Sequence, residues 1–152
     1  MGRIITKEES EIVLSENGEW FHQGEPFENP KIIAFFHRAI RKDENGNYFL
    51  YNAYKEKEEN VYFDVKDTAY FIKDISFDEN NNVFRGRLNT EDEVELKLKT
   101  LEEDKRGVMY CRVLDNDKAR FSKYALLELS KHAIMEDDQV YIELNGERIP
   151  IG

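Results

Sequence analysis

The stretch Gly18–Tyr51, GEWFHQGEPFENPKIIAFFHRAIRKDENGNYFLY, contains the signals for a hairpin strand, a helix and a second strand in one continuous run. A strand over 11–14 and a strand over 19–22 flank a turn whose Asn-Gly pair readily takes the positive φ angles of a tight hairpin. The sequence therefore predicts two paired antiparallel strands shortly before the helix.

The helix is predicted to begin at Asn29, whose side chain caps a first turn in which Pro30 loses nothing by lacking an N–H. Apolar residues then recur at the spacing of one helix face, at Ile32, Phe35, Phe36, Ala39 and Ile40. We expect this stripe to pack on a sheet, so that Phe35→Ala costs on the order of 3–5 kcal/mol. The run Asp43–Gly46 breaks the helix, and a strand over 47–52 follows.

The middle of the chain is typical of a β meander, in which short strands alternate with turns rich in Asp, Asn and Gly. The expected strands cover 60–65, 69–77, 82–88, 93–99 and 108–114. Within one of them Val94, Leu96 and Leu98 alternate with charged residues, which indicates an antiparallel strand with one buried face.

A second helix is expected after Ser122 as its N-cap, with apolar residues at Leu126, Leu129, Ala133 and Ile134. Strands over 139–144 and 147–151 then flank a second Asn-Gly turn. The predicted fold class is α+β, with mostly antiparallel strands and two amphipathic helices. Because the chain has 152 residues, we expect a single compact domain over 1–152.

The two helical segments echo each other. When Phe27 is aligned with Phe121 the apolar patterns superpose, and both helices lead through an acidic turn into an aromatic strand. The chain is thus a candidate for two repeated modules, about 12–75 and 106–152, packed around a pseudo-twofold axis. The alternative is that any two amphipathic helices align on their stripes. If the repeat is real, a pocket is expected at the seam between the modules.

The formal net charge of −10 opposes binding to a phosphate backbone or an anionic membrane, so we expect no nucleic acid and no membrane as partners. A local basic patch is nevertheless present at the end of the first helix, at Arg38, Arg41 and Lys42. It is a candidate anion site. The alternative is that these cations interact favourably with the helix macrodipole.

A cytoplasmic location is expected from the cysteine usage and the N-terminus. Cys111 is the single cysteine and cannot form an intrachain disulfide, and the opening residues MGRIITKEES lack the apolar run of a signal peptide. No apolar segment approaches the roughly 20 residues that span a bilayer.

Recognisable catalytic chemistry is missing from the sequence pattern. The histidines His22, His37 and His132 lie far apart and have no metal-ligand spacing, so we interpret them as packing or surface residues. Cys111 falls in an apolar strand pattern and is interpreted as an inert core residue. The eight glycines form no phosphate-binding motif. We therefore assign no catalytic residue, and we expect neither a metal nor a cofactor.

Candidate ligand-binding residues are Trp20, His22, His37, Asp67 and Arg120. His22 adjoins Trp20, a residue type favoured where a surface is apolar and still forms hydrogen bonds. Asp67 lies in a predicted turn, and its alternative role is turn formation. Arg120 precedes a helix start, where free N–H groups bind anions, and its alternative role is a surface ion pair.

Four ordered segments resemble the landmarks of the DUF1285 family of bacterial proteins, over roughly 18–151. They are GEWFHQGEPFENPKIIAFFHRAIRKDENGNYFLY, VYFDVKDTAYF, RLNTEDEV and ARFSKYALLELSKHAI. The matching residues are Trp20-Phe21, Asp43 with Gly46 and Tyr48, the turn Asp67–Phe71, and Ser122. The resemblance implies an α+β fold with repeated motifs, no established enzymatic activity, and a role in signalling or ligand sensing. This chain departs from the family in having Ala69-Tyr70 where a Pro-Phe pair is common.

These observations favour a non-catalytic cytoplasmic module that binds a small molecule or a protein partner, with a signalling role. The expected site lies near Trp20, His22 and His37 and the start of the second helix by Arg120. The alternative is an enzyme whose carboxylates or His22 meet only in the fold, which a deep cleft with strongly shifted titratable groups would favour. A third interpretation is a regulatory protein that acts through its acidic surface.

Overall fold

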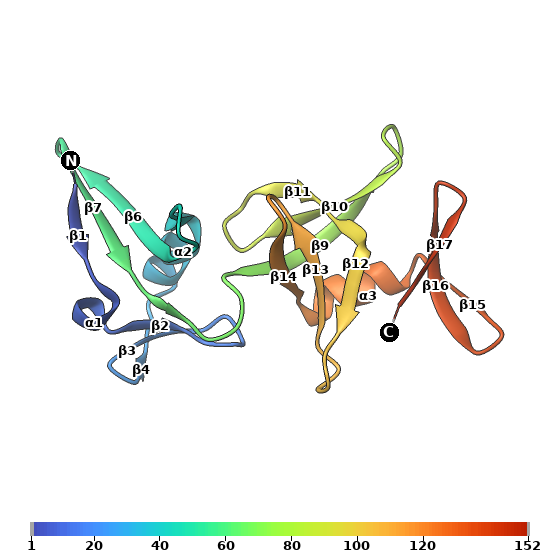
Figure 1. The fold of residues 1–152 in the computed structure, drawn as a ribbon, viewed down its shortest axis with the longest axis horizontal. Coiled ribbons are helices and arrows are strands. Elements are labelled where there is room, and N and C mark those ends of the chain that lie inside the picture. Colours follow the sequence, from blue (N-terminus) through green and yellow to red (C-terminus); the bar gives the residue numbers. More distant parts are fainter. Residues whose placement is uncertain (1, 152) are drawn as a thin grey trace. The chain divides into compact units, whose positions relative to one another are not determined.

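The computed structural model describes residues 2–151, and its contacts divide the chain into two compact units. The N-terminal unit ends at Ala69 and the C-terminal unit begins at Tyr70. Among the described residues 51% are in strands and 15% in three helices, and most strand pairs are antiparallel (Figure 1). The predicted α+β class is confirmed. The single domain and the internal repeat stay predictions, and each unit is described by itself.

The N-terminal unit contains two four-stranded sheets and two helices within the described residues. Its elements in chain order are β1 (Arg3–Ile5), α1 (Lys7–Ser10), β2 (Ile12–Leu14), β3 (Trp20–His22), β4 (Glu25–Pro26), α2 (Pro30–Ala39), β5 (Ile40–Lys42), β6 (Tyr48–Tyr54), β7 (Lys57–Tyr62) and β8 (Asp64–Val65). One sheet has the strand order β1-β7-β6-β5 and the other has the order β4-β3-β2-β8. The helix α2 packs beside β6 (Figure 1).

The predicted hairpin is confirmed, because β2 and β3 pair antiparallel with Leu14 opposite Trp20. Gly18 takes a φ of 82° in the turn, and the amide of Ser15 donates to the carbonyl of Glu19 at 2.8 Å. Directly opposed residues share one face of a sheet, and here that face is buried, with Leu14 0% and Trp20 2% exposed. The hairpin register thus places the indole in the interior.

The helix α2 begins where the sequence predicts. Asn29 Oδ1 accepts hydrogen bonds from the amides of Lys31 at 2.9 Å and Ile32 at 3.4 Å, as expected of an N-cap. The helix ends earlier than expected, because Ile40 begins β5 and pairs with Leu50 of β6. Ile40 is therefore buried as a strand residue, where the sequence had placed it on the helix stripe.

The buried face of α2 is turned by about one position from the predicted stripe, so that prediction is wrong in part. Ile32 and Phe35 are 41% and 39% exposed, whereas Phe36 and His37 are half-buried against Trp20. The run IIAFF is apolar throughout, so contacts with β3 select the packing face where the helical period alone does not. Phe35→Ala is therefore expected to lower the free energy of unfolding by less than the roughly 3–5 kcal/mol that is typical of a buried Phe.

Asp43 fixes the turn that follows β5. Its Oδ1 accepts hydrogen bonds from the amides of Asn45 and Asn47, both at 2.9 Å, and its Oδ2 accepts one from the Tyr62 hydroxyl of β7 at 3.0 Å. These hydrogen bonds, led by the one from the Asn47 amide, lower the pKa of the Asp43 carboxyl although desolvation opposes them. The predicted break after the helix is confirmed.

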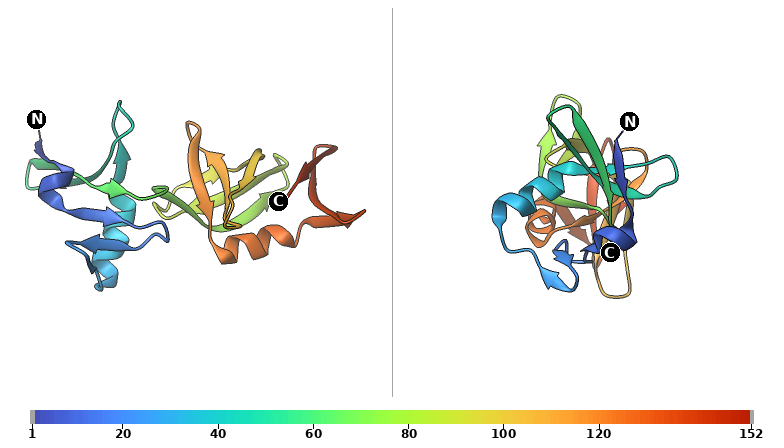
Figure 2. Two further views of the ribbon diagram at one scale, coloured as in Figure 1. Left: turned by 60° about the horizontal axis from the view of Figure 1, so that its bottom comes forward. Right: turned by 90° about the vertical axis from the view of Figure 1, so that its left-hand side faces the viewer.

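The C-terminal unit contains a six-stranded sheet, a three-stranded sheet and one helix within the described residues. Its elements are β9 (Tyr70–Asp78), β10 (Val83–Leu88), β11 (Glu93–Glu95), β12 (Lys97–Glu103), β13 (Met109–Val113), β14 (Asp117–Phe121), α3 (Lys123–Ser130), β15 (Ala133–Glu136), β16 (Gln139–Leu144) and β17 (Glu147–Pro150). The larger sheet has the order β11-β10-β9-β14-β13-β12, and the smaller has the order β15-β16-β17. The helix α3 packs along β9 and β14 (Figure 2).

The alternation predicted within 93–99 is confirmed, since Val94, Leu96 and Leu98 are 8%, 3% and 2% exposed. The segment is nevertheless two strands, because β11 pairs with β10 and β12 pairs with β13 at the other end of the strand order. One continuous stretch therefore occupies both edges of the six-stranded sheet. The sheet curls so that its first and last strands join at Leu96, which limits free strand edges.

The helix α3 is capped as predicted, because Ser122 Oγ accepts a hydrogen bond from the amide of Ala125 at 3.0 Å. It ends at Ser130, so the prediction that Ala133 and Ile134 continue the helix is wrong. Both residues lie in β15, which pairs with β16. Backbone pairing to the neighbouring strand thus outweighs the helical spacing of these two residues.

Candidate functional site

Five rings of the N-terminal unit form one connected group, here called the aromatic cluster: Trp20, Phe27, Phe36, His37 and Phe63. The Trp20 ring centroid lies 5.3 Å from that of Phe36, 5.5 Å from that of His37 and 4.9 Å from that of Phe63. Phe27 extends the cluster outward, 4.9 Å from Phe36 and inclined to it by 76°. Such aromatic pairs stabilise by about 0.5–1.5 kcal/mol beyond the area that they bury.

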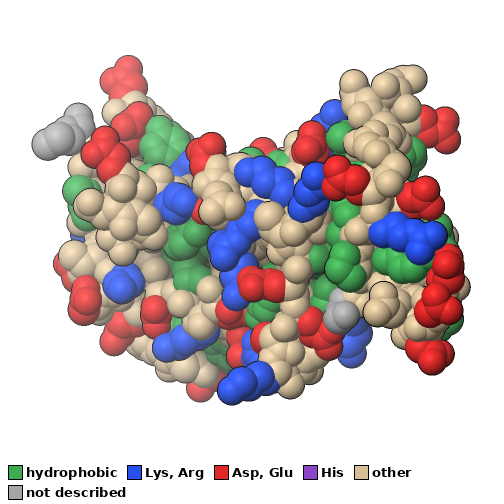
Figure 3. Space-filling view, turned by 45° about the vertical axis from the view of Figure 1, so that its right-hand side comes forward, with side chains coloured by type: hydrophobic (Ala, Val, Ile, Leu, Met, Phe, Trp, Pro, Cys, Tyr) green, Lys and Arg blue, Asp and Glu red, His purple; other side chains and the backbone are tan. Residues whose placement is uncertain are grey.

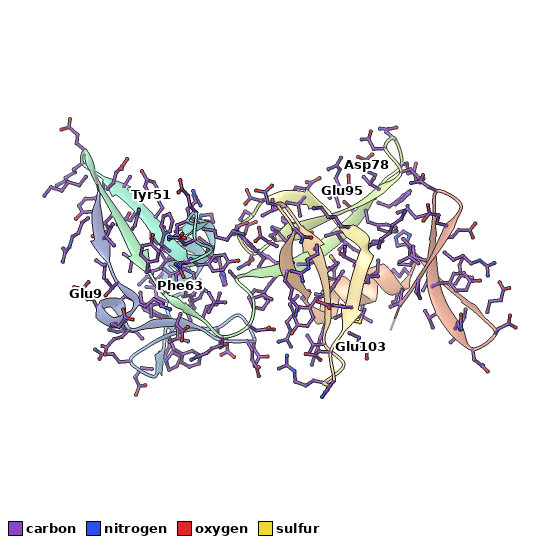
Figure 4. The ribbon with its side chains drawn as sticks, viewed as in Figure 1. Glu9, Tyr51, Phe63, Asp78, Glu95 and Glu103 are labelled. Atoms are coloured by element: carbon purple, nitrogen blue, oxygen red, sulfur yellow. The ribbon has the colours of Figure 1, made fainter. Side chains whose placement is uncertain are left out.

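The cluster joins several elements of the N-terminal unit. Trp20 lies on β3, and Phe36 and His37 lie on α2. Phe63, labelled in Figure 4, lies between β7 and β8. The amide of Phe63 donates to the carbonyl of Tyr48 on β6 at 3.3 Å, so the chain is held to both sheets at this point. The rings are therefore held by several elements at once, and the cluster gives α2 a fixed packing surface.

A hydrogen bond joins two residues that the sequence selected as site candidates. The indole N–H of Trp20 donates to the imidazole of His37, with Nε1 lying 3.3 Å from Nε2 and 3.4 Å from Nδ1. The contact fixes the rotation of α2 about its axis, because His37 is held toward β3.

The side of α2 that points away from the cluster is here called the outer face of α2, and it consists of Lys31, Ile32, Phe35 and Arg38. All four side chains are exposed. Phe35 lies next to the cluster, with its ring centroid 6.2 Å from that of Phe36. The outer face therefore combines two apolar and two cationic side chains over a rigid aromatic base.

The charges in the segment from the N-cap of α2 to the end of β5 are of one sign. Residues 29–42 contain Lys31, Arg38, Arg41 and Lys42 and neither Asp nor Glu. Arg41 Nη1 donates to the carbonyls of Arg38 at 3.1 Å and Ile40 at 2.9 Å, as the macrodipole interpretation of the basic patch predicts. Among residues 2–151, no hydrogen bond or ion pair is made by the side chains of Lys31 and Arg38.

Of the five candidate residues, the structure brings Trp20 and His37 into contact. His22 is exposed at the rim, where its ring centroid lies 6.1 Å from that of Phe27. Asp67 is half-buried in the N-terminal unit after β8, and the aromatic cluster is built without it. Arg120 belongs to the C-terminal unit, where β14 pairs it with Tyr110 and Phe71. The binding roles of all five stay predictions.

Sequence reasoning did not select Phe27, Phe63 and Lys31 as parts of the site. Phe27 and Phe63 are aromatic residues outside the predicted helical stripe, and their proximity arises only from the fold. The signal for Lys31 was present in the sequence, because the acid-free run 29–42 begins two residues before it. The basic patch predicted from the sequence includes only the cations at the end of that run.

A separate hollow of about 820 Å³ lies at the β6–β7 hairpin and is lined by Arg3, Ala53, Tyr54, Lys55, Glu56, Lys57, Glu58 and Glu59. Its wall mixes exposed charges of both signs. The Tyr51 hydroxyl donates to Glu58 at 2.9 Å, so part of the polar lining is already hydrogen-bonded within the hairpin. The hollow offers no apolar base comparable to the aromatic cluster.

The carboxyl groups whose pKa clearly departs from its ordinary value are all shifted downward: Glu9, Asp43, Asp78, Glu91, Asp104 and Glu136. Hydrogen bonds from Asn81 and Arg85 lower the pKa of Asp78 to about 2. A lowered pKa keeps a carboxylate ionised and makes it a poor general acid near neutral pH. Burial raises the pKa of the Cys111 thiol to about 12, which disfavours a nucleophilic thiolate.

Within 2–151 no group of three or more His, Cys, Asp or Glu side chains is arranged to hold a metal ion. None of the described helices has the length and apolarity needed to cross a membrane.

The C-terminal unit pairs most of its arginines. Arg87 lies 2.6 Å from Asp74 and 2.8 Å from Glu91. The other arginine pairs in that unit are Arg85–Asp78 at 3.0 Å, Arg106–Asp104 at 2.8 Å and Arg148–Glu136 at 3.3 Å. On the face that Figure 3 presents, acidic and basic side chains lie among one another. Because of these ion pairs, the arginines of the C-terminal unit carry less uncompensated positive charge than the cations on the outer face of α2.

Comparison with known families matches residues 5–68 to the "Domain of unknown function (DUF1285), N-terminal domain". The match ends one residue before Ala69, where the N-terminal unit ends. No match is found among curated proteins. The resemblance to the DUF1285 family is thus confirmed for the part of the chain that holds the aromatic cluster.

Two solved structures of DUF1285 family proteins share the fold. The protein from Silicibacter pomeroyi DSS-3 superposes with a TM-score of 0.66 at 17% identity, over 99% of this chain and 83% of its own. The protein from Shewanella baltica OS155 superposes with a TM-score of 0.54 at 13% identity, over 80% of this chain and 91% of its own. At these identities the likeness concerns the fold alone.

Proposed function

From the premise that residues 5–68 form a DUF1285 N-terminal domain, we propose that this chain is a non-catalytic cytoplasmic binding module. It holds a small molecule or a protein partner on the outer face of α2 and serves a signalling role. Nucleic acid and membrane are not its partners, because the net charge of −10 repels both.

The observation that carries the proposal is the exposure of Phe35 and Ile32 on a helix whose opposite face is packed on the aromatic cluster. Trp20 is buried beneath and holds Phe36 and His37 by ring contacts. Exposed apolar side chains on a rigid support are the usual anchors of an interface, because little conformational entropy is lost when a partner covers them.

The non-catalytic part of the proposal is supported by the downward pKa shifts. A general acid needs a carboxyl pKa raised toward neutral pH, whereas the shifted carboxyls here are held ionised by hydrogen bonds from neighbours in turns and hairpins. The alternative, an enzyme with a carboxylate and histidine site, has no specific geometric observation in its favour.

The test uses Trp20, the single tryptophan, as a built-in fluorescent reporter. Because its indole contacts α2 residues, a ligand on the outer face is expected to change its emission. The chain is titrated with a panel of nucleotides, metal ions, organic acids, sugars and short peptides. Thermal unfolding is followed in parallel, since a ligand at a hundred times its Kd stabilises the folded chain by about 2.7 kcal/mol.

Two variants localise any binding. Phe35→Ala removes the apolar anchor and is expected to abolish the response, whereas Leu127→Ala removes an exposed apolar side chain of α3 in the C-terminal unit and is expected to preserve it. A panel ligand that binds both variants as tightly as the parent chain would place the site away from α2 and refute the proposal. Turnover of a panel compound would refute its non-catalytic part.

A further inference from the structure

The strongest local departure from the overall charge of the chain lies on and around α2. The net charge is −10, yet residues 29–42 carry four cations and neither Asp nor Glu. Acidic residues flank this run at Glu28 and Asp43. Asp43 is already committed to the amides of its own turn and to the Tyr62 hydroxyl. The run therefore keeps a local positive field within an acidic protein.

Two of these cations frame an apolar side chain. Lys31, Phe35 and Arg38 have the spacing i, i+4 and i+7, which places them along one line of the helix surface. Seven residues of α-helix rise about 10.5 Å, so the two cationic positions lie about 10 Å apart along α2 with Phe35 between them. Ile32 adjoins the same line and widens the apolar middle.

The cations that frame Phe35 are unsatisfied, unlike their neighbour Arg41. Arg41 is occupied by the carbonyls at the end of α2. The side chains of Lys31 and Arg38 make no hydrogen bond or ion pair with residues 2–151. Their charge is thus available to an external anion without first breaking an internal contact.

We infer that the outer face of α2 binds an acidic peptide segment of a partner protein. The segment places two carboxylates about 10 Å apart against Lys31 and Arg38 and a Phe, Leu or Ile side chain between them against Phe35 and Ile32. This inference rests on the proposed function, because it names the chemistry of the partner for the same surface.

A peptide fits this surface better than the other polyanions. A bilayer or nucleic acid presents an extended negative surface that also meets the remaining, acidic surface of the chain and is repelled by it. A short peptide covers only the outer face. The apolar middle also favours a partner with apolar side chains, which a phosphate backbone does not offer toward a helix.

The probe is a fluorescein-labelled synthetic peptide in which a Phe-Leu pair is flanked on each side by two Glu residues. Its matched control has Gln in place of every Glu. Binding to the full chain is measured by fluorescence anisotropy at low and high salt. We expect the Glu peptide to bind at least about tenfold more tightly than the Gln peptide at low salt, and the difference to shrink at high salt because exposed charges are screened.

Two double variants test the residues. Lys31→Glu with Arg38→Glu is expected to weaken the Glu peptide by about tenfold or more, because two exposed ion pairs are replaced by repulsion. Lys105→Glu with Lys123→Glu makes the same change in net charge on exposed lysines of the C-terminal unit and is expected to leave binding unchanged. Trp20 emission and circular dichroism check that all four substituted positions leave the fold intact.

The outcomes separate this inference from the proposed function. If the Gln peptide binds as well as the Glu peptide and Phe35→Ala abolishes both, the acidic partner is refuted while the binding surface stands. If neither peptide binds but a small panel ligand binds at α2, the acidic peptide is refuted and the proposed function stands. If nothing binds at α2, both are refuted. Preferential binding to phosphatidylserine vesicles would refute the peptide in favour of a membrane. Self-association that Lys31→Glu with Arg38→Glu removes would refute it in favour of a second copy of the chain.

Discussion

The N-terminal helix α2 and the C-terminal sheet unit arrange their charges in opposite ways. In the C-terminal unit Arg87 is shared between Asp74 and Glu91. On α2, Arg38 is exposed and makes no side-chain ion pair or hydrogen bond with residues 2–151. One region has its positive charge neutralised by neighbours in the same sheet, and the other keeps its positive charge toward solvent. Uncompensated charge beside exposed apolar side chains is the reason why we propose α2 as the binding region.

A second difference concerns the interior. The aromatic cluster supports α2 with large rings from several elements, whereas the C-terminal unit buries mainly aliphatic residues such as Ile72, Leu88 and Val113. The outer members of the cluster, Phe27, Phe36 and His37, are half-buried. The aliphatic core is closed by strand pairing around the curled sheet.

Loss of stability should be greatest in the aromatic cluster and much smaller on the outer face of α2. Trp20→Ala should lower the free energy of unfolding by about 3–5 kcal/mol, because it removes a buried ring and its partners cannot fully collapse. Phe35→Ala should cost less than about 1.5 kcal/mol, since that ring is partly exposed already. Urea denaturation followed by circular dichroism compares the two. Equal losses would show that α2 is rotated differently from the structure.

An intermediate effect is expected in the C-terminal unit from Gly86→Val in β10. A Cβ at Gly86 would lie 2.7 Å from Leu96 Cδ2 and 3.1 Å from Ile72 Cγ2, inside the closed core of the curled sheet. Overpacking of this kind costs about 1–3 kcal/mol. Urea denaturation measures it. Because the substitution is in the C-terminal unit, peptide binding at α2 is expected to persist in the folded variant. Loss of binding would show that the two regions are not independent.

Acid should weaken the ion-paired unit through Asp104. Desolvation raises the pKa of this carboxyl, but hydrogen bonds from the Arg106 side chain and the amides of Val108 and Arg106 outweigh it and lower the pKa from 3.8 to about 2. The stabilisation is therefore complete above the ordinary pKa and is lost as pH falls from 3.8 toward 2.

Unfolding free energies measured across that range should fall less steeply for Asp104→Asn than for the parent chain. Arg106→Gln is expected to act in the same direction by removing the donor. An unchanged slope in both variants would show that the pairing at Asp104 contributes nothing in solution.

The smallest expected effect concerns a turn of the three-stranded sheet. Asp137 and Asp138 have φ of 53° and 63°, values that glycine adopts more easily, whereas the next turn uses Asn145 and Gly146. Asp138→Gly should raise the free energy of unfolding by about 0.5–1 kcal/mol, and Gly146→Asp should lower it by a similar amount. Peptide binding is expected to be unaffected by both. Urea midpoints that move in the same direction for the two variants would contradict the turn argument.

Local signals determine how much of this fold the sequence predicts. The Asn-Gly turn, the Asn29 cap and the alternation at Val94, Leu96 and Leu98 each depend on a few neighbouring residues, and all three are confirmed. The strands β5 and β15 were missed because Ile40, like Ala133 and Ile134, fits a helical stripe as well as a short strand. Strand β14 and the first elements, β1 and α1, lie outside every predicted segment.

The candidate site shows the same limit. Trp20 and His37 were selected from residue type, and their contact is a product of β3 meeting α2. The packing face of α2 was not predictable, because every residue of its IIAFF run is apolar. Contact with Trp20, which lies on another element, decides which of them are buried. Which side chains remain exposed for a partner therefore depends on tertiary contacts.

Whether a partner binds the outer face of α2 can be read residue by residue from amide chemical shifts. ¹⁵N-labelled chain is titrated with the Glu-flanked peptide at low salt. If the outer face of α2 is the binding surface, the largest shifts are expected on residues 30–39 and on the indole of Trp20, and the sheet residues of the C-terminal unit should change little. Largest shifts among residues 70–151, or saturable binding that leaves α2 unchanged, would contradict it.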